Sequence, residues 1–196
     1  MWVDEQNGAL VYTTVNTERV GLVSEWADPR GIPTPSKNNR APDGIVDASG
    51  RIVIVYAVPF NEGRGVYMVE ADGRDLNWST PIQVFDGLAA GWDLVGDPKI
   101  SLTSDGVLHV IFSRYSAHQV NQAIGLYSTQ SSDGGVTWSP AELVREGSIT
   151  WSDIISYNPG TLHRFWQEDH QSVVSNFDQS SQDGGHTWGT PVEITS

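Results

Sequence analysis

Arginine, carboxylate and aromatic side chains gather in two kinds of segment of this 196-residue chain. Segments that join predicted strands carry Phe60, Asn61, Glu62, Arg64, Arg114, Tyr115, His118, Glu168, Asp169 and His170. Segments that lead into predicted strands carry Arg40, Asp43, Trp92, Asp93, Asp97, Lys99, Trp151 and Asp153. A guanidinium group can bind a carboxylate through two parallel hydrogen bonds, and an aromatic ring adds an apolar face. Such a mixture is typical of a rim that binds sugars.

The elements that must position these residues form a repeat. Segments 131–140 and 181–191 are nearly identical, and both contain Ser-x-Asp-Gly-Gly-x-Thr-Trp. Their tryptophans, Trp138 and Trp188, are 50 residues apart. A third copy at 71–81 keeps Trp78 and the following proline, and a fourth at 24–29 keeps little of the pattern. A repeat of about 50 residues built from strands predicts the blades of a β-propeller.

The strands repeat in the same phase. A turn that ends in glycine, at Gly8, Gly50, Gly106 or Gly160, precedes each of the β-rich runs 9–14, 51–57, 107–113 and 161–167. A further strand is expected at 20–24, 65–69, 124–129 and 173–178, and a short one at 81–84, 140–144 and 191–194. We therefore predict an all-β fold, a β-propeller of four-stranded antiparallel blades in a single domain. The blades are expected at 1–40, 41–91, 92–147 and 148–196.

The repeated box reads as a hairpin turn. Its aspartate, Asp133 or Asp183, can accept backbone N–H groups across the turn, and its glycines supply positive φ angles. Its threonine suits the outgoing strand, and its tryptophan packs against the blade. A calcium loop or phosphate cradle is the alternative, but no cluster of oxygen ligands and no following helix support it. We expect His186, in the second box, to face solvent.

The composition of the chain limits the kinds of molecule that it is expected to bind. Eleven basic against 24 acidic residues give a net charge of −13, which repels phosphate and argues against nucleic acid or an anionic membrane surface. No run of 18 apolar residues predicts membrane insertion, and the first residues lack the pattern of a signal peptide. The absence of cysteine excludes disulfides and thiolate metal sites. We expect no metal and no cofactor, a carbohydrate or protein ligand, and an extracellular or cell-surface location, any leader lying outside this sequence.

The two full boxes and the degenerate copy in phase with them resemble the Asp-box (BNR) repeat of sialidases and their propeller relatives. The resemblance covers essentially the whole chain as repeat architecture. It implies boxes between the third and fourth strands of each blade, on the face opposite the active site. The functional face would then carry the loops 58–64, 114–123 and 168–172 and the residues that lead into each first strand.

The resemblance also implies roles for single residues. Sialidases hold the sialic acid carboxylate with three arginines, use a Tyr–Glu pair as nucleophile and supply an aspartate as acid/base. Arg40-Ala41-Pro42 is similar to the Arg-Ile-Pro motif that gives the first arginine, but the loop of the same blade has Glu62 and no aspartate. The expected ligand-binding residues are Arg40, Asp43, Arg64, Trp92, Asp97, Arg114, Trp151 and Asp153. The candidate catalytic residues are Tyr115, Tyr157, Glu168 and Glu62.

Three functions stay open at this point. The first is a sialidase-like module that binds a glycan or protein on its loop-rich face without efficient catalysis, as the missing aspartate favours. The second is an active exo-sialidase or related glycoside hydrolase, and the third is a structural or assembly module. Sialidase propellers have six blades, whereas this chain has material for about four. It is therefore part of a longer protein, half of a ring completed by a second copy, or a small propeller.

Overall fold

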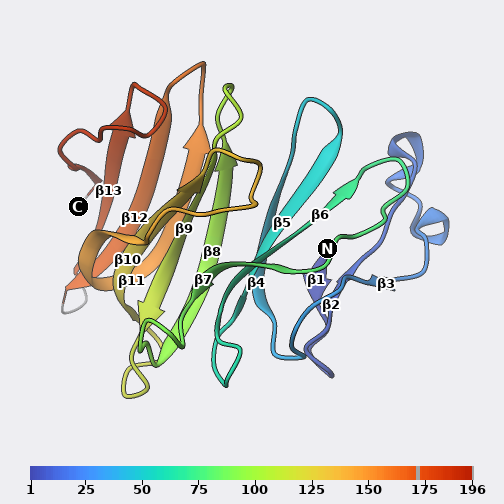
Figure 1. The fold of residues 1–196 in the computed structure, drawn as a ribbon, viewed down its shortest axis with the longest axis horizontal. Helices are drawn as coiled ribbons and strands as arrows, with labels where there is room; N and C mark the ends of the chain where they lie inside the picture. Colours follow the sequence, from blue (N-terminus) through green and yellow to red (C-terminus); the bar gives the residue numbers. More distant parts are fainter. Residues whose placement is uncertain (171–172, 196) are drawn as a thin grey trace.

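The computed structural model describes residues 1–170 and 173–195 of the chain (Figure 1). These residues form fourteen strands and two short 3-10 turns, η1 (Thr17–Arg19) and η2 (Val23–Glu25). The strands are β1 (Trp2–Val3), β2 (Leu10–Tyr12), β3 (Arg30–Gly31), β4 (Arg40–Val46), β5 (Arg51–Val58), β6 (Gly65–Asp72), β7 (Ile82–Asp86), β8 (Leu94–Leu102), β9 (Leu108–Tyr115), β10 (Ala123–Ser131), β11 (Glu142–Ser156), β12 (Leu162–His170), β13 (Val173–Ser181) and β14 (Val192–Thr195). No helix in the described residues has the length and apolar character needed to span a membrane.

The strands form three antiparallel sheets in which neighbours in sequence pair with each other. The first sheet has the order β1-β2-β3, the second β4-β5-β6-β7, and the third β14-β13-β12-β11-β10-β9-β8. Short turns between strands permit this meander, because antiparallel neighbours need no crossover. The prediction of an all-β fold with antiparallel sheets is confirmed.

The third sheet is continuous because β11 belongs to two meanders. Its first part, Glu142–Ile149, pairs with β10, and its second part, Ile149–Ser156, pairs with β12. The sequence predicts separate strands here, and the structure joins them into one strand of 15 residues. Gly147, at a φ of 141°, and register shifts near Ile149 mark the place where the strand changes partners.

Apolar residues fill three cores between successive meanders. Alternate residues of β5 point in opposite directions, because side chains of a strand alternate between the two faces of its sheet. Val53 and Val55 enter the core shared with β8 and β9, whereas Ile54 and Tyr56 enter the core shared with the first sheet. The third core joins Ile111, Leu126, Leu162 and Trp166. Each core also receives one box tryptophan, in chain order Trp78, Trp138 and Trp188.

The box segments form the hairpin turns that the sequence predicts. The Asp133 carboxylate accepts hydrogen bonds from the Thr137 backbone N–H (2.9 Å) and from the Ser131 hydroxyl (2.8 Å). Asp183 repeats both contacts at 2.8 Å. The threonine hydroxyl and backbone N–H, with the serine hydroxyl, hold the pKa of each aspartate at about 2. These aspartates therefore stay ionised and hold the turns in place.

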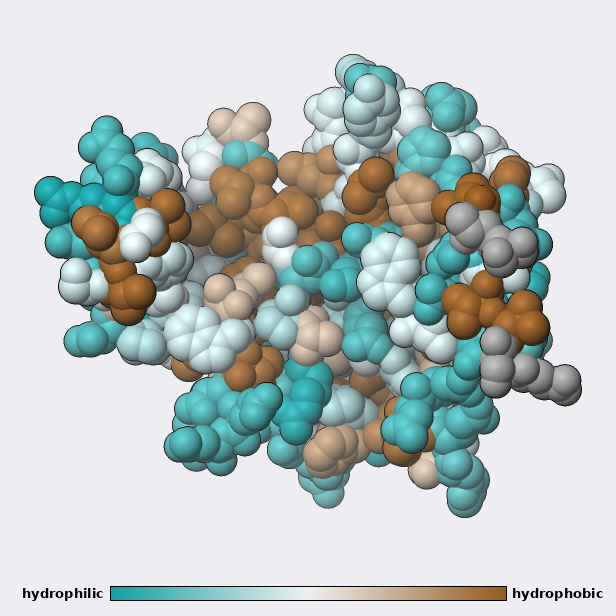
Figure 2. Space-filling view, turned by 180° about the vertical axis from the view of Figure 1, so that it is seen from behind, coloured by the Kyte–Doolittle hydropathy of each residue, from teal (hydrophilic) through white to brown (hydrophobic). Residues whose placement is uncertain are grey.

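The strand predicted at 20–24 is wrong. This segment joins η1 to η2 and includes the first two residues of η2, and β3 provides the third strand of the first sheet instead. The Asn16 side chain accepts the backbone N–H of Glu18 at 2.9 Å and so starts η1, because a local side-chain cap competes with strand pairing. Val23 is 88 % exposed. The first sheet and the two 3-10 turns together form a lobe at the left of Figure 2, which shows apolar side chains on the surface of this lobe.

The pairing registers place two sets of connections at opposite ends of the sheets. Arg40 pairs with Ala57, and Leu94 pairs with Tyr115, so the starts of β4 and β8 lie beside the loops 59–64 and 116–122. We call this end the loop face. The box turns and the turns 47–50, 103–107 and 157–161 lie at the other end, which we call the turn face.

Candidate functional site

Hydrogen bonds join neighbouring connections of the loop face to one another. The Val95 N–H donates to the Pro59 carbonyl at 3.2 Å, and the Ala117 N–H donates to Asp93 Oδ2 at 3.1 Å. Gln122 Nε2 donates to Asp169 Oδ2 at 3.3 Å, which ties loop 116–122 to the end of β12. The loop face is thus one connected surface over β4–β12. Residues 171 and 172 of the expected loop 168–172 lie outside the described residues.

Strands β4 and β8 are kinked in the same way near their starts on the loop face. Ala41 has a φ of 47° and Asp97 a φ of 50°, and each precedes a proline. Each lies in a register shift, between Arg40 and Asp43 in β4 and between Gly96 and Lys99 in β8. A positive φ costs a residue other than glycine about 1 kcal/mol or more. Because Ala41 and Asp97 both adopt it, we infer that the fold requires this backbone conformation at this end of both strands. Bulges of this kind change the direction in which side chains point.

Three predicted arginines lie on the loop face. Arg40 is exposed, and its Nη1 donates to the Asn39 carbonyl at 2.8 Å. Arg64 is half-buried and donates to the Asn61 carbonyl at 3.2 Å, while the half-buried Arg114 stacks over Trp92 with its guanidinium carbon 5.5 Å from the ring centroid. The buried Nε atoms of Arg64 and Arg114 have no hydrogen-bond partner. Among the described residues, none of the three forms an ion pair with a carboxylate.

Asp97 and Tyr115 form a pair on the same face. The Tyr115 hydroxyl donates to Asp97 Oδ2 across the β8–β9 edge. Burial and the neighbouring Asp97 carboxylate raise the pKa of Tyr115 above its usual value. The phenol therefore keeps its proton at neutral pH and acts as a hydrogen-bond donor.

Two other predicted ligand residues have structural contacts. Trp92 is 7 % exposed and packs in the core, with its ring centroid 4.5 Å from those of Phe85 and Tyr127. Asp43 Oδ2 accepts the backbone N–H of Ile100 at 2.9 Å and so joins β4 to β8. Both residues help to build the face on which the arginines lie.

Trp151 and Asp153 lie away from the arginines. They line a groove of about 470 Å³ on the outward side of β11–β14, together with Phe165, Phe177 and Ile194. Trp151 is 51 % exposed. The groove is mostly apolar, unlike the arginine-bearing part of the loop face.

Glu168 lies in a buried cluster that the sequence did not predict. Its side chain is fully buried, and its oxygens accept hydrogen bonds from Arg145 Nη2 (2.9 Å), Trp166 Nε1 (2.7 Å) and His170 Nε2 (2.8 Å). Arg145 Nε forms an ion pair with Glu168 Oε1 at 2.6 Å. Burial raises the pKa of Glu168, but the hydrogen bonds from Arg145, Trp166 and His170 outweigh it and lower the pKa overall. The bidentate contact with Arg145 indicates a structural anion.

The structure pairs neither candidate tyrosine with Glu168. Tyr115 bonds to Asp97, and Tyr157 lies on the turn face, where its N–H donates to the Thr161 carbonyl. Ile149 pairs with Glu168, whereas Ser156, next to Tyr157, pairs with Leu162 at the other end of the strand. About seven residues of strand span roughly 20 Å, too far for a proton transfer between Tyr157 and Glu168. Glu62 is exposed in loop 59–64.

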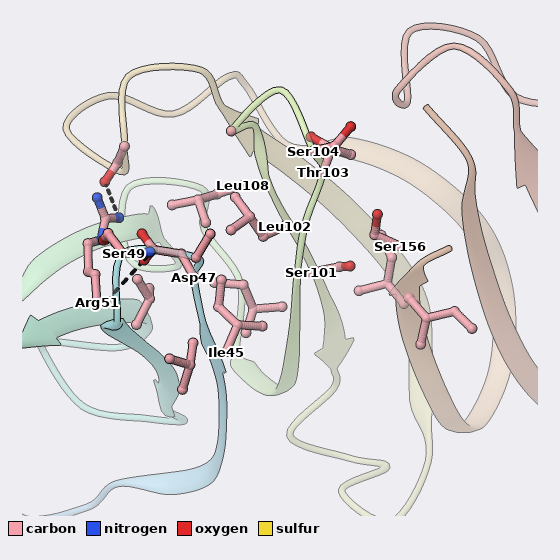
Figure 3. Close-up of a pocket in the computed structure, with 18 of the residues that line it drawn as sticks. Ile45, Asp47, Ser49, Arg51, Ser101, Leu102, Thr103, Ser104, Leu108 and Ser156 are labelled. Atoms are coloured by element: carbon pink, nitrogen blue, oxygen red, sulfur yellow. Dashed lines mark hydrogen bonds between the residues drawn. The ribbon is translucent and has the colours of Figure 1, made fainter. Parts of the chain in front are cut away.

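A cavity lies on the turn face and not among the arginines. It measures about 890 Å³ and is bordered by β4, β8 and the second half of β11 (Figure 3). Its charged residues already have partners: Asp47 accepts N–H groups of Ser49 and Arg51, and Arg51 pairs with Glu70 at 3.0 Å. The remaining lining is mainly serine, threonine and aliphatic side chains. We therefore place the candidate site on the loop face, where Arg40, Arg64 and Arg114 have no carboxylate partner among the described residues.

In the part of the chain that the structure describes, no group of three or more His, Asp or Glu side chains is arranged to hold an ion. The groups that the loop face presents are guanidinium groups, the Tyr115 hydroxyl and carboxylates. Together they suit hydrogen bonding to an acidic, hydroxylated ligand.

Comparison with known proteins identifies the fold. No protein family and no curated protein matches the chain. A Hadza microbial sialidase is 21 % identical with a TM-score of 0.59, covering 79 % of this chain and 37 % of its own. The α-L-arabinofuranosidase of Fusarium graminearum, solved with arabinobiose, is 15 % identical with a TM-score of 0.62, covering 84 % and 52 %. An ulvan lyase, a polysaccharide lyase, is 13 % identical with a TM-score of 0.62, covering 96 % and 50 %.

These likenesses concern the fold alone, because all the identities are below 25 %. The chain has the β-propeller type of fold that these carbohydrate-active enzymes share. It spans about half the length of two of them and about a third of the sialidase.

Proposed function

We propose that this chain is a sialidase-like propeller module of Asp-box repeats, with blades at 1–40, 41–91, 92–147 and 148–196 in one domain. It binds an acidic carbohydrate on its loop face and is not an efficient catalyst. The observation that carries the proposal is the set of Arg40, Arg64 and Arg114, which share this face without a carboxylate partner among the described residues. The fold supports it, because a sialidase, an arabinofuranosidase and a polysaccharide lyase share that fold.

The charge of the chain sharpens the choice of ligand. The chain has a net charge of −13, and Arg19, Arg51, Arg74 and Arg145, four of its nine arginines, each pair with a carboxylate. Arginines left without such a partner suit an anionic group of a ligand, for which the guanidinium fork has the right geometry. A sugar carboxylate fits this requirement and adds hydroxyls for the loop carbonyls and carboxylates.

The arrangement of carboxylates favours binding over catalysis. Glycoside hydrolysis needs two carboxyl groups, or a nucleophile with its base, on either side of one bond. Glu168 is held by Arg145, Trp166 and His170, and Asp97 by Tyr115. The raised pKa of Tyr115 keeps the phenol neutral, which weakens it as a nucleophile.

Calorimetric titration with 3′-sialyllactose and with neutral lactose tests the proposal. We expect binding of sialyllactose only, and Arg40→Ala should weaken it by about 2 kcal/mol, roughly 30-fold, because a charge-assisted pair is lost. Arg19→Ala is the matched control, since Arg19 lies in η1, outside the loop face, and pairs with Glu25 at 2.9 Å. Equal binding of both sugars, no binding of either, or an Arg40→Ala variant that binds as tightly as the wild type would contradict the proposal.

One observation favours a glycoside hydrolase as a second candidate. Tyr115 and Asp97 are a tyrosine and a carboxylate in direct contact on the loop face. Turnover of a fluorogenic sialoside that disappears in Tyr115→Phe would establish this alternative. Equal, negligible rates for the wild type and Tyr115→Phe would support a binding module.

A further inference from the structure

The outward side of the third sheet repeats a surface that is buried elsewhere in the same chain. The first strands of three successive meanders, β4, β8 and the second half of β11, are called the inner strands here. Equivalent positions in them are occupied by Asp43, Lys99 and Asp153, because each pairs with the residue five positions after a turn glycine. Those partners are Val55, Ile111 and Phe165. Val55 packs in the core shared with β8 and β9, and Ile111 packs in the core shared with β11 and β12. By the same geometry Phe165 faces away from the rest of the chain.

Asp153 carries the same hydrogen-bonding group as Asp43 at this outward face. Asp43 Oδ2 joins two meanders by accepting the Ile100 N–H of the next inner strand at 2.9 Å. Asp153 Oδ1 accepts the N–H of its own neighbour, Ile154, at 2.8 Å, and its Oδ2 accepts no hydrogen bond from a described residue. Beside it lies the apolar groove of Trp151, Phe165 and Ile194, whereas the Phe177 side chain stacks on Trp166 and packs against the third core. This face therefore has both parts of an interface between meanders, the apolar surface and the acceptor for a strand N–H.

The other end of the chain also exposes apolar side chains. The first sheet and its 3-10 turns lie at the end opposite β13 and β14 (Figure 1). On this lobe Trp2 and Trp26 are each 40 % exposed, Leu22 is 56 % exposed and Val23 is 88 % exposed. Figure 2 shows brown surface at both ends, on this lobe and beside the grey residues. Exposed apolar surface of this extent marks interaction sites.

We propose that a second copy of this chain docks on the outward face of β11–β14, so that two copies close one propeller ring head to tail. The groove of each copy packs against the first sheet of the other, and Asp153 accepts a backbone N–H from that sheet. Three considerations favour a second copy. The interface continues one already present between β4 and β8, two copies leave neither apolar end exposed, and the chain spans 50 % and 52 % of two solved propellers. The loop faces of both copies would then surround one axis.

Light scattering over a concentration series tests this proposal. The wild type should approach about twice 21.4 kDa, and added salt should favour the pair, because two chains of charge −13 repel each other less when screened. Ile194→Glu in the groove and Val23→Glu in η2, which lies beside the first sheet, should each give the monomer mass with unchanged circular dichroism. Val136→Glu is the matched control, since Val136 is 70 % exposed in a box turn, away from both surfaces. Asp153→Ala should weaken association by roughly tenfold.

A mixture of the Ile194→Glu and Val23→Glu variants adds a test of the arrangement. The first variant keeps an intact first sheet and the second an intact groove, so the mixture should form a heterodimer through one interface. A wild type that stays monomeric at every concentration and salt level would overturn the proposal. A Val23→Glu variant that still dimerises would overturn it as well, because the copies would then meet groove to groove.

Discussion

At the scale of the residue, His109 has an unusual environment. It is 4 % exposed, its Nε2 is buried without a hydrogen-bond partner, and it lines a small polar cavity with Glu142 and His186. Burial lowers its pKa to about 4, although Asp105 acts in the opposite direction. The side chain is therefore neutral in the folded protein at pH 7.

This environment predicts a pH dependence of stability. An unfolded chain takes up a proton on His109 near pH 6.5, whereas the folded chain does so only near pH 4. The folded state therefore has its full stability above pH 6.5 and loses up to about 3 kcal/mol as the pH falls from 6.5 to 4. Urea unfolding at several pH values should show this slope. His109→Gln should abolish it, whereas His118→Gln, in an exposed loop, should keep it; an unchanged slope in His109→Gln would show that other groups cause it.

Residue types alone did not reveal the Glu168 cluster. Arg145 and Glu168 are 23 positions apart, and their contact exists only because β11 lies between β10 and β12. Arg164 is another case, because its partner Trp188 lies 24 positions away in the sequence. It lies 3.9 Å from the ring centroid of Trp188, and burial lowers its pKa to about 10. Partners chosen by tertiary contacts leave no spacing signal in the sequence.

At the scale of the element, the strands of residues 41–195 could be predicted well from local signals. Turn glycines such as Gly50 and Gly106 and the box tryptophans mark where strands start and end, and β5–β7, β9, β10 and β12–β14 lie within a few residues of the expected runs. No range was predicted for β4 and β8. The first sheet lacks a clear box, so no local signal showed whether its apolar run 20–24 forms a strand. The merging of two strands into β11 was equally invisible, because it depends on pairing with β10 and β12.

The kinks of β4 and β8 give a prediction about these elements. At its φ of 47°, Ala41 is strained by the contact of its Cβ with the backbone, and glycine would not have this strain. Ala41→Gly should leave the free energy of unfolding unchanged or raise it by up to about 1 kcal/mol, since lower strain competes with a more flexible unfolded chain. Ala41→Val should lower it by more than 1 kcal/mol, because a β-branched residue resists this conformation. Chemical denaturation of the three proteins is the measurement; a stable Ala41→Val variant would mean that the kink can relax.

At the scale of the whole molecule, the candidate site follows from how the meanders are stacked. Antiparallel pairing brings Arg40, Arg64 and Arg114 to one face although they span 75 positions of the sequence. The sequence predicted this grouping through the repeat, since equivalent connections of successive repeats must lie on the same face. It could not predict that Trp92 would be buried or that Trp151 and Asp153 would line a separate groove. Those outcomes depend on which neighbours each meander has.

The proposed function requires that ligand binds to the loop face and not to the cavity of about 890 Å³ on the turn face. Hydrogen–deuterium exchange with and without 3′-sialyllactose distinguishes the two places, because backbone protection locates the contact. We predict slower exchange in the loops 59–64 and 116–122 and at the start of β4, with the turns 47–50 and 103–107 unchanged. Protection confined to those turns, or no protection anywhere, would contradict the account.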